Sequence, residues 1–146
     1  MPLIYKKGDL LSSGTDLIAH QCNCSSLRGL GLSAAMFRKY PCANTYNKTS
    51  VRVPGTISVH EDRIVNMYGQ KFPGKPKSKS GDDCSETRKH FFQKCLDDIS
   101  TIIEEKTIAF PKFIGCGLAG GNWTDYEKML ETFEKKHPGQ VYIVFL

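Results

Sequence analysis

The stretch that decides the fold is Gly115-Cys116-Gly117-Leu118-Ala119-Gly120-Gly121-Asn122-Trp123, which holds four glycines within seven residues. It follows Thr107-Ile108-Ala109-Phe110, typical of a buried strand, and precedes Thr124-Asp125-Tyr126-Glu127, which has the spacing of a helix-capping box. The order is therefore strand, glycine loop, helix. No side chain in this loop supplies an acid or base at neutral pH, so we expect it to bind through backbone N–H groups. Anions, phosphates above all, are the usual ligands of such loops.

Two nucleotide-binding motifs share part of this pattern, but neither fits this chain. Gly115-x-Gly117-x-x-Gly120 matches the dinucleotide fingerprint, but that motif follows the first strand of a long βαβαβ array. Here the loop ends at residue 121 of 146, so only 25 residues remain. A P-loop requires Lys-Ser or Lys-Thr after its last glycine, and neither is present. A glycine-rich surface turn stays an alternative, although each glycine costs extra backbone entropy on folding.

Length and composition indicate one domain spanning residues 1–146, with 40% hydrophobic residues and a single core. No apolar run has the length of a transmembrane helix, and the N-terminus lacks a signal-peptide pattern. We therefore expect an intracellular protein, cytoplasmic or nuclear, or located in the host cell if it is viral. The six cysteines form no CxxC pair, and His20, Cys22 and Cys24 alternate along a strand without converging. We expect reduced thiols, no metal and no cofactor.

The net charge of +5 suits a small anionic ligand or a weak contact with nucleic acid. Several lysines gather in residues 71–81, a segment rich in proline, glycine and serine. We interpret this segment as a solvated linker. Nucleic acid is accordingly not the expected partner, although it remains an alternative.

A second strand, loop and helix follow one another near the N-terminus. The near-continuous apolar run from Leu17 to Cys22 is typical of a central strand covered on both faces. Residues 23–31 form a polar loop with glycines, and residues 32–39 have the period of a short helix. Gly31 stands where a side-chain cap is usual, which leaves N–H groups free and favours an anion. Both glycine loops are expected to open at the same edge of the sheet.

The remaining pattern predicts a hairpin at residues 55–68, a long helix after Asp83-Cys84-Ser85-Glu86, a last helix after the second capping box, and a final strand at residues 141–145. Apolar residues from Phe91 to Ile103 recur at three- to four-residue spacing, so the long helix is expected to pack on a core. Strands that alternate with helices, plus one hairpin, predict a three-layer α/β/α fold. Its centre is a mixed sheet of about six strands.

Taken together, these residues resemble the macro domain, an ADP-ribose-binding module, over nearly the whole chain. Gly8-Asp9-Leu10 resembles the opening turn of that family, residues 23–31 its first ligand loop, and residues 115–123 its diphosphate loop. Residues 18–24 and 114–118 are most similar to one small branch. That branch contains the yeast-type ADP-ribose 1″-phosphate phosphatase, its phage and viral relatives, and the terminal ADP-ribose protein glycohydrolase.

The resemblance implies a role for each part of the site. It assigns the adenine to Asp9 and Leu10. It assigns the distal ribose to Asn23, Gly29, Leu30 and Gly31. It assigns the diphosphate to Gly115, Cys116, Gly117, Leu118, Ala119, Gly120 and Gly121.

The catalytic residues implied by the resemblance are His20 and Asn23, with Lys71 as a possible addition. His20 matches a histidine of the phosphatase branch that orients a water or donates to a leaving oxygen; a hydrogen-bonded core histidine is the alternative. Ala119 stands where the glycohydrolase has an acidic residue. This chain therefore lacks the carboxylate that cooperates with a lysine in the mechanism of that relative. Leu30 replaces a glycine usual in the family and narrows the first loop.

The function implied is binding of ADP-ribose with hydrolysis of a 1″-linked group, ADP-ribose 1″-phosphate phosphatase first. A hydrolase of mono-ADP-ribosyl esters on glutamate or aspartate is one alternative, and a non-catalytic ADP-ribose reader is another. The expected partners are ADP-ribose, ADP-ribose 1″-phosphate and ADP-ribosylated proteins. We expect a monomer that does not associate with membranes.

Overall fold

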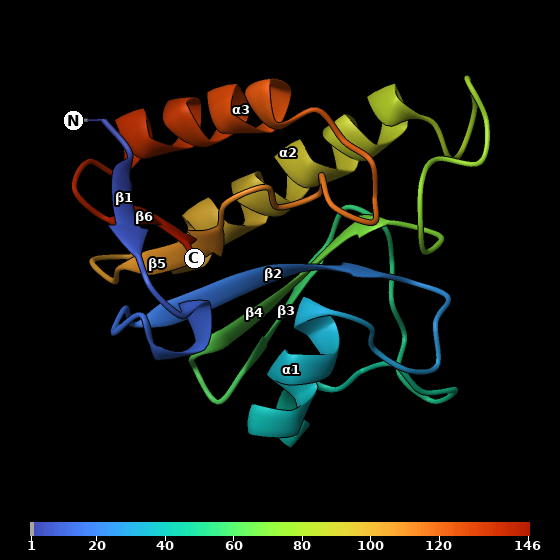
Figure 1. The fold of residues 1–146 in the computed structure, drawn as a ribbon, viewed down its shortest axis with the longest axis horizontal. Coiled ribbons are helices and arrows are strands. Elements are labelled where there is room, and N and C mark those ends of the chain that lie inside the picture. The colour runs from blue at the N-terminus through green and yellow to red at the C-terminus, as the bar shows by residue number, and fades with distance from the viewer. Residues whose placement is uncertain (1) are drawn as a thin grey trace.

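A computed structural model describes residues 2–146, in which six strands and three α-helices alternate along the chain (Figure 1). The strands are β1 (Ile4–Lys7), β2 (Leu17–Asn23), β3 (Ile57–His60), β4 (Ile64–Gln70), β5 (Ile108–Pro111) and β6 (Val141–Phe145). The helices are α1 (Leu32–Lys39), α2 (Ser85–Ile102) and α3 (Trp123–Lys136). Within this described range, no helix is long and apolar enough to cross a membrane.

All six strands form one mixed sheet in the order β1-β6-β5-β2-β4-β3. Every neighbouring pair is parallel except β3 and β4, which form the antiparallel hairpin predicted from the sequence. β2 pairs with β4 on one side and with β5 on the other, so it is central. This position explains why five of its first six residues are buried although the strand carries a histidine.

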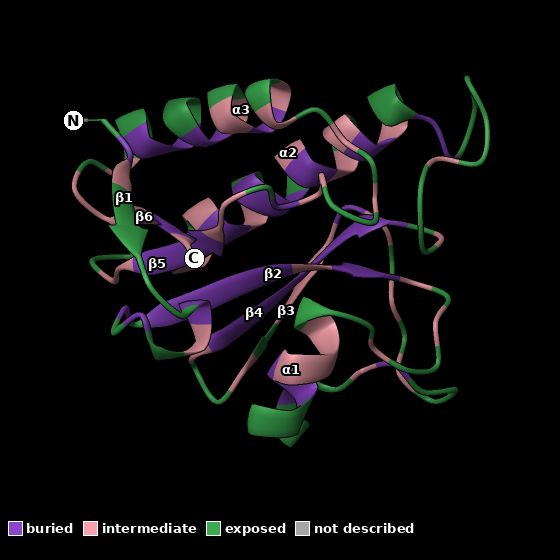
Figure 2. Ribbon diagram, in the orientation of Figure 1, coloured by how far each residue is buried: buried purple, intermediate pink, exposed green. Residues whose placement is uncertain are grey.

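Helices cover both faces of the sheet, with α2 and α3 on one face and α1 on the other (Figure 1). The larger core lies under α2 and α3 and contains Phe92, Leu96, Phe110 and Leu130. The smaller core lies under α1 and contains Met36. Figure 2 shows the buried side of each helix turned toward the sheet. The predicted three-layer α/β/α fold is confirmed.

Both predicted capping boxes were placed wrongly, although both helices exist. Helix α2 begins one residue later than Asp83 predicts, because Cys84 is the N-cap and its sulfur accepts from the amide of Thr87. Helix α3 begins earlier, at an N-cap formed by Asn122, whose side chain accepts from the amide of Thr124. Asn caps helices as well as Ser or Thr does, and Asp83 is engaged in an ion pair.

The parallel strands direct three connections to one edge of the sheet. β2, β4 and β5 all end there, and the segments that follow them are residues 24–31, 71–84 and 112–122. Open α/β sheets bind ligands at the carboxyl ends of their strands. The candidate site is therefore at this edge.

Candidate functional site

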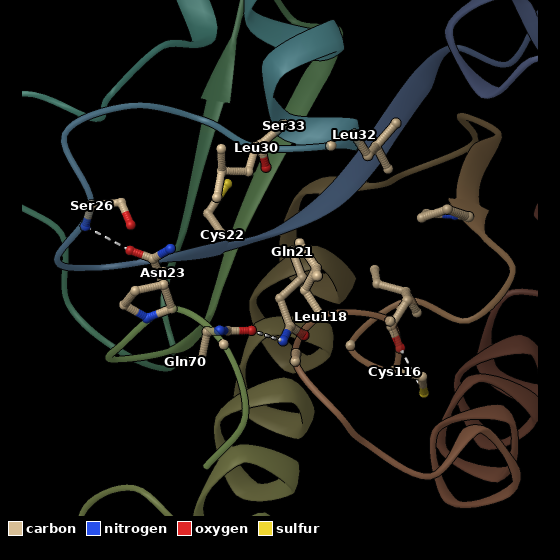
Figure 3. A pocket seen from close by; sticks show the side chains of 18 of the residues that line it. Gln21, Cys22, Asn23, Ser26, Leu30, Leu32, Ser33, Gln70, Cys116 and Leu118 are labelled. Atoms are coloured by element: carbon tan, nitrogen blue, oxygen red, sulfur yellow. Dashed lines mark hydrogen bonds between the residues drawn. The ribbon is translucent and has the colours of Figure 1, made fainter. Parts of the chain in front are cut away.

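A cavity of about 530 Å³ opens at this edge, within the usual size range of small-molecule sites. It is lined by residues 21–23, 26, 28, 30–33, 46, 70, 73–74 and 111–119. Figure 3 shows Leu30, Leu32 and Ser33 reaching it from the region of α1, and Leu118 from the glycine loop. The two loops predicted to meet do meet here.

The glycine loop is closed by a hydrogen bond from the amide of Gly121 to the carbonyl of Gly115, at 3.0 Å. A methyl group on Gly121 would lie 2.5 Å from that carbonyl oxygen, so only glycine permits this approach. Gly115 has φ +74° and Gly120 has φ +75°, a left-handed backbone that glycine adopts without strain. Gly115, Gly120 and Gly121 are therefore required by backbone geometry.

The closed loop leaves a run of amides without internal partners. The amides of Cys116, Gly120 and Gly121 donate to carbonyls of the chain. The amides of Gly117, Leu118 and Ala119 have no acceptor within residues 2–146, and all three residues line the cavity. Consecutive free N–H groups of this kind bind anions.

The first loop is organised by Asn23, which is 9% exposed and lines the cavity. Its Oδ1 accepts from the amides of Ser25 at 3.0 Å and Ser26 at 2.8 Å (Figure 3). Its backbone amide donates to the hydroxyl of Tyr46 at 2.9 Å. The side-chain oxygen is thus engaged in the turn, and the Nδ2 group is the part of Asn23 that is left to donate to a ligand.

Helix α1 begins at the cavity without a side-chain cap. Gly31 is its N-cap, makes no capping hydrogen bond, and is followed by a first turn without an acidic residue. Gly31, Leu32 and Ser33 line the cavity. The helix dipole and the unpaired amides of this first turn add to the attraction for negative charge. The predicted helix start is confirmed.

The charge around the cavity is positive. Arg28 and Lys112 are the charged residues that line it, and no carboxylate or imidazole is among its lining residues in the described chain. Burial raises the pKa of the Cys116 thiol to about 11 and also raises the pKa of Cys22 and Tyr46, so these groups stay protonated at neutral pH. The cavity suits an anion and contains no evident general base.

His20 lies beneath the cavity, is 1% exposed and is not one of the lining residues. Its Nε2 lies 2.6 Å from Oδ1 of Asn66, whose Nδ2 donates to the carbonyl of Ala43 at 2.8 Å. Because this places the oxygen of Asn66 toward the imidazole, Nε2 carries the proton and Nδ1 is an acceptor. The hydroxyl of Ser33, which lines the cavity, is 3.5 Å from Nδ1. Burial lowers the pKa of His20 to about 4, so the ring is neutral.

The structure places several predicted site residues away from the cavity wall. Asp9 is exposed and its side chain accepts from the amide of Leu11, whereas Leu10 is buried in the core beneath α1. Gly29 packs against α1, where a methyl group would lie 2.9 Å from the amide nitrogen of Ala34. Their contacts with a ligand stay predictions.

Three more predicted residues are outside the lining. Gly120 and Gly121 shape the glycine loop without facing the cavity. Lys71 is exposed, its carbonyl accepts from the amide of Cys24, and its ammonium group lies 5.5 Å from the ring centre of Phe72. A catalytic role for Lys71 stays a prediction.

Sequence reasoning missed residues that reach the cavity through long-range contacts. The Nε2 of Gln21 donates to Oε1 of Gln70 at 2.7 Å (Figure 3). Gln70 in turn donates to the carbonyl of Phe72. Gln21 lies near the end of β2 and Gln70 is the last residue of β4, the neighbouring parallel strand. The only signal in the sequence is that each glutamine lies close to the end of a buried strand. Tyr46 comes from an irregular segment without any recognisable motif.

The solvated-linker interpretation of residues 71–81 was wrong for the backbone of this segment. Its lysines are exposed, as a solvated loop predicts. However, Pro73 and Gly74 line the cavity, and the carbonyls of Phe72 and Gly74 accept from the buried Arg88. Hydrogen bonds from the buried Arg88 hold the backbone of a segment that composition alone predicts to be a solvated linker.

Comparison with known proteins identifies the fold. The macrodomain of Mycobacterium tuberculosis DarG has a TM-score of 0.76 at 22% identity, over 98% of this chain and 96% of that one. Thermosipho africanus DarTG in complex with ADP-ribose has a TM-score of 0.71 at 16% identity, over 98% of this chain and 42% of that one. The Trypanosoma brucei macrodomain in complex with ADP has a TM-score of 0.61 at 14% identity, over 97% of this chain and 62% of that one. This chain has the macrodomain fold.

A sequence relative is a 17.5 kDa protein from the tk-vs intergenic region of Enterobacteria phage T4. It is 28% identical over an alignment of 151 positions, gaps included, that spans 90% of each chain. No family model matches the sequence.

Replacement of Gly115 by alanine is expected to lower the free energy of unfolding by about 2 kcal/mol or more. The new methyl group would lie 2.6 Å from Cε2 of Tyr126, at a residue with φ +74°. Gly117→Ala is the matched control, because a methyl group there has no neighbour within 4 Å. Its free energy of unfolding should change by less than about 1 kcal/mol. Urea denaturation measures both, and equal losses would contradict the geometric requirement at Gly115.

His20 predicts a pH dependence of stability. Its pKa is about 4 in the folded protein against 6.5 when unfolded, so the unfolded state binds more protons between these values. The free energy of unfolding should therefore fall as pH drops from 6.5 toward 4, by up to about 3 kcal/mol. Urea denaturation of the wild type and His20→Gln at several pH values isolates this contribution. Parallel pH profiles would show that His20 does not titrate in this way.

Proposed function

We propose that this protein binds ADP-ribose in the cavity, with the diphosphate on the amides of residues 117–119. The observation that carries this proposal is the convergence of those unpaired amides with the uncapped start of α1 at one cavity. Two macrodomain-fold neighbours, from Thermosipho africanus and Trypanosoma brucei, are complexes with ADP-ribose and ADP. A diphosphate ligand supplies the negative charge that this arrangement favours.

Asn23 is proposed to hold the distal ribose through its Nδ2 group. The oxygen of the same side chain is engaged by the amides of Ser25 and Ser26, which fixes the orientation of the amide plane. Arg52 reinforces the loop by donating to the carbonyls of Asn23 and Ser26. The site is thus preorganised before a ligand arrives, which reduces the entropy lost on binding.

Binding without acid–base catalysis is what the geometry supports best. Hydrolysis of a glutamate or aspartate ester by a lysine and a carboxylate has no such pair among the lining residues of the described chain. Ala119 supplies a methyl group in the loop, and Lys71 lies outside the lining. The proposed role is accordingly an ADP-ribose reader that accepts free ADP-ribose or ADP-ribosylated proteins.

Calorimetry with ADP-ribose tests the proposal and its Asn23 contact together. We expect single-site binding by the wild type and an affinity reduced about tenfold or more in Asn23→Asp, which keeps the turn oxygen but loses the Nδ2 donor and repels the diphosphate. Asp62→Asn is the control, because Asp62 lies in the hairpin turn between β3 and β4. Its affinity should be unchanged. Absence of binding at millimolar ADP-ribose would reject the function, and equal affinity in Asn23→Asp would reject the contact.

A second candidate, ADP-ribose 1″-phosphate phosphatase, is favoured by one specific observation. Asn66, His20 and Ser33 form a chain of contacts that ends at the cavity. In this scheme neutral His20 acts through Ser33, whose hydroxyl positions the attacking water. Arg28, at the same cavity, provides a charge for the terminal phosphate.

Release of inorganic phosphate from ADP-ribose 1″-phosphate tests the second candidate. The rate of phosphate release is expected to be at least tenfold lower in His20→Gln and in Ser33→Ala than in wild type, because each variant loses a general acid–base contribution. Because the pKa of His20 is about 4, this group should leave the wild-type rate flat between pH 5 and 8. If the wild type releases phosphate no faster than buffer but still binds ADP-ribose, the phosphatase candidate is rejected and only the reader function remains.

A further inference from the structure

Arg88, near the start of α2, is buried and uses all of its hydrogen-bonding capacity. Its side chain is 3% exposed. Nε and Nη2 donate to the two carboxylate oxygens of Asp83, at 2.7 and 3.2 Å. The other hydrogen bonds go to the carbonyls of Gly74 at 2.6 Å, Phe72 at 3.2 Å and Ala119 at 3.3 Å. A guanidinium has five N–H donors, and here each has a partner.

These three carbonyls belong to two different loops that form the cavity. Phe72 and Gly74 follow β4, whereas Ala119 is the last of the three residues with unpaired amides in the glycine loop. The loops also touch beside the arginine, because a methyl group on Gly120 would lie 2.8 Å from Cγ of Lys75. Arg88 therefore joins the two walls at the point where they meet.

The hydrogen bond to Ala119 bears on the anion site directly. A carbonyl held by Arg88 fixes the peptide plane that follows Ala119. The amide in that plane belongs to Gly120, which donates to the carbonyl of Gly117 at 3.1 Å and so closes the turn that carries the amides of Leu118 and Ala119. The amides of Leu118 and Ala119 are among those left free for an anion. Their direction thus depends on a side chain that does not line the cavity.

Asp83 completes the arrangement by compensating the buried charge. It also accepts from the amide of Lys77 at 3.0 Å, so it fastens the far part of the same loop. Burial alone would raise the pKa of Asp83, but the hydrogen bonds from Arg88 and Lys77 keep it below its usual value. The carboxylate therefore remains ionised beside Arg88.

We propose that Arg88 is a positioning residue of the anion subsite: held by Asp83, it ties residues 72–74 to Ala119 and so orients the amides that take the diphosphate. This inference rests on the proposed function. It adds a residue outside the cavity to the machinery that recognises the ligand. It also explains why a lysine-rich, proline- and glycine-rich segment follows a fixed path.

The test compares Arg88→Lys with a variant that loses stability elsewhere. Lysine keeps a cation beside Asp83 but lacks the planar fork that reaches the carbonyls of both loops. Ile99→Ala is the control, because Ile99 is fully buried further along α2 and makes no contact with the cavity. Urea denaturation gives the folded fraction of each variant, so calorimetric affinities refer to folded protein.

We expect the affinity of Arg88→Lys for ADP-ribose to fall at least tenfold and that of Ile99→Ala to stay within twofold of wild type. Equal affinities in wild type and Arg88→Lys, or equal losses in both variants, would overturn the inference. If Arg88→Lys does not fold, Asp83→Asn takes its place, since it leaves the arginine without its compensating charge. The same result is expected from it.

A ligand-free measurement separates this inference from the proposed function. Amide hydrogen exchange of Gly120 and Gly121, whose N–H groups are hydrogen-bonded within the loop, should be at least tenfold faster in Arg88→Lys than in wild type, and no faster in Ile99→Ala after correction for global unfolding. If the wild type binds no ADP-ribose but this difference in exchange rate is still observed, the proposed function is rejected and the positioning role of Arg88 is kept. Unchanged exchange at Gly120 and Gly121 in Arg88→Lys would reject the positioning role whatever the ligand.

Discussion

The hydrogen bond between the amide of Gly121 and the carbonyl of Gly115 is the constraint on which the site depends. It closes a loop in which the amides of Gly117, Leu118 and Ala119 are left without partners. Gly117 and Leu118 are exposed and Ala119 is half-buried, so water can solvate these amides before a ligand arrives. An anion can replace that water without breaking any hydrogen bond of the loop.

The surrounding structure supports this arrangement in two ways. The uncapped start of α1 places a second set of free amides at the same cavity, and no carboxylate of residues 2–146 lines it to compete with a bound anion. The loops that carry these groups are fixed from outside the cavity by Arg88, and on the other wall by Arg52. In the proposed binding mode, backbone amides take the anion, and these arginines hold the loops that carry the amides.

Much of the fold was predictable because its signals are local. The apolar run of β2, the period of α1 and the turn between β3 and β4 each depend on a few neighbouring residues, and the structure has all three. The caps of α2 and α3 were misplaced because several residues at each helix start can cap it, and tertiary contacts decide among them. Asp83, the predicted cap of α2, forms an ion pair with Arg88 instead.

The site was predictable only in part, because several of its residues are placed by contacts between segments far apart in the sequence. The glycine loop and Asn23 are visible as motifs, but Tyr46, Gln70 and Arg88 reach the cavity or its walls through pairs far apart in the sequence. Nothing in the neighbouring sequence of Arg88 distinguishes it from an exposed helical arginine. Its role arises only when the segments after β4 and β5 are brought together.

The titrating groups near the cavity place a limit on how its charge can vary. Burial raises the pKa of Cys22 and Cys116 and lowers that of His20, so all three stay neutral at physiological pH. The electrostatic attraction for a diphosphate is therefore nearly constant between pH 5 and 8. A site of this kind responds to the presence of an anion and not to the acidity of its surroundings.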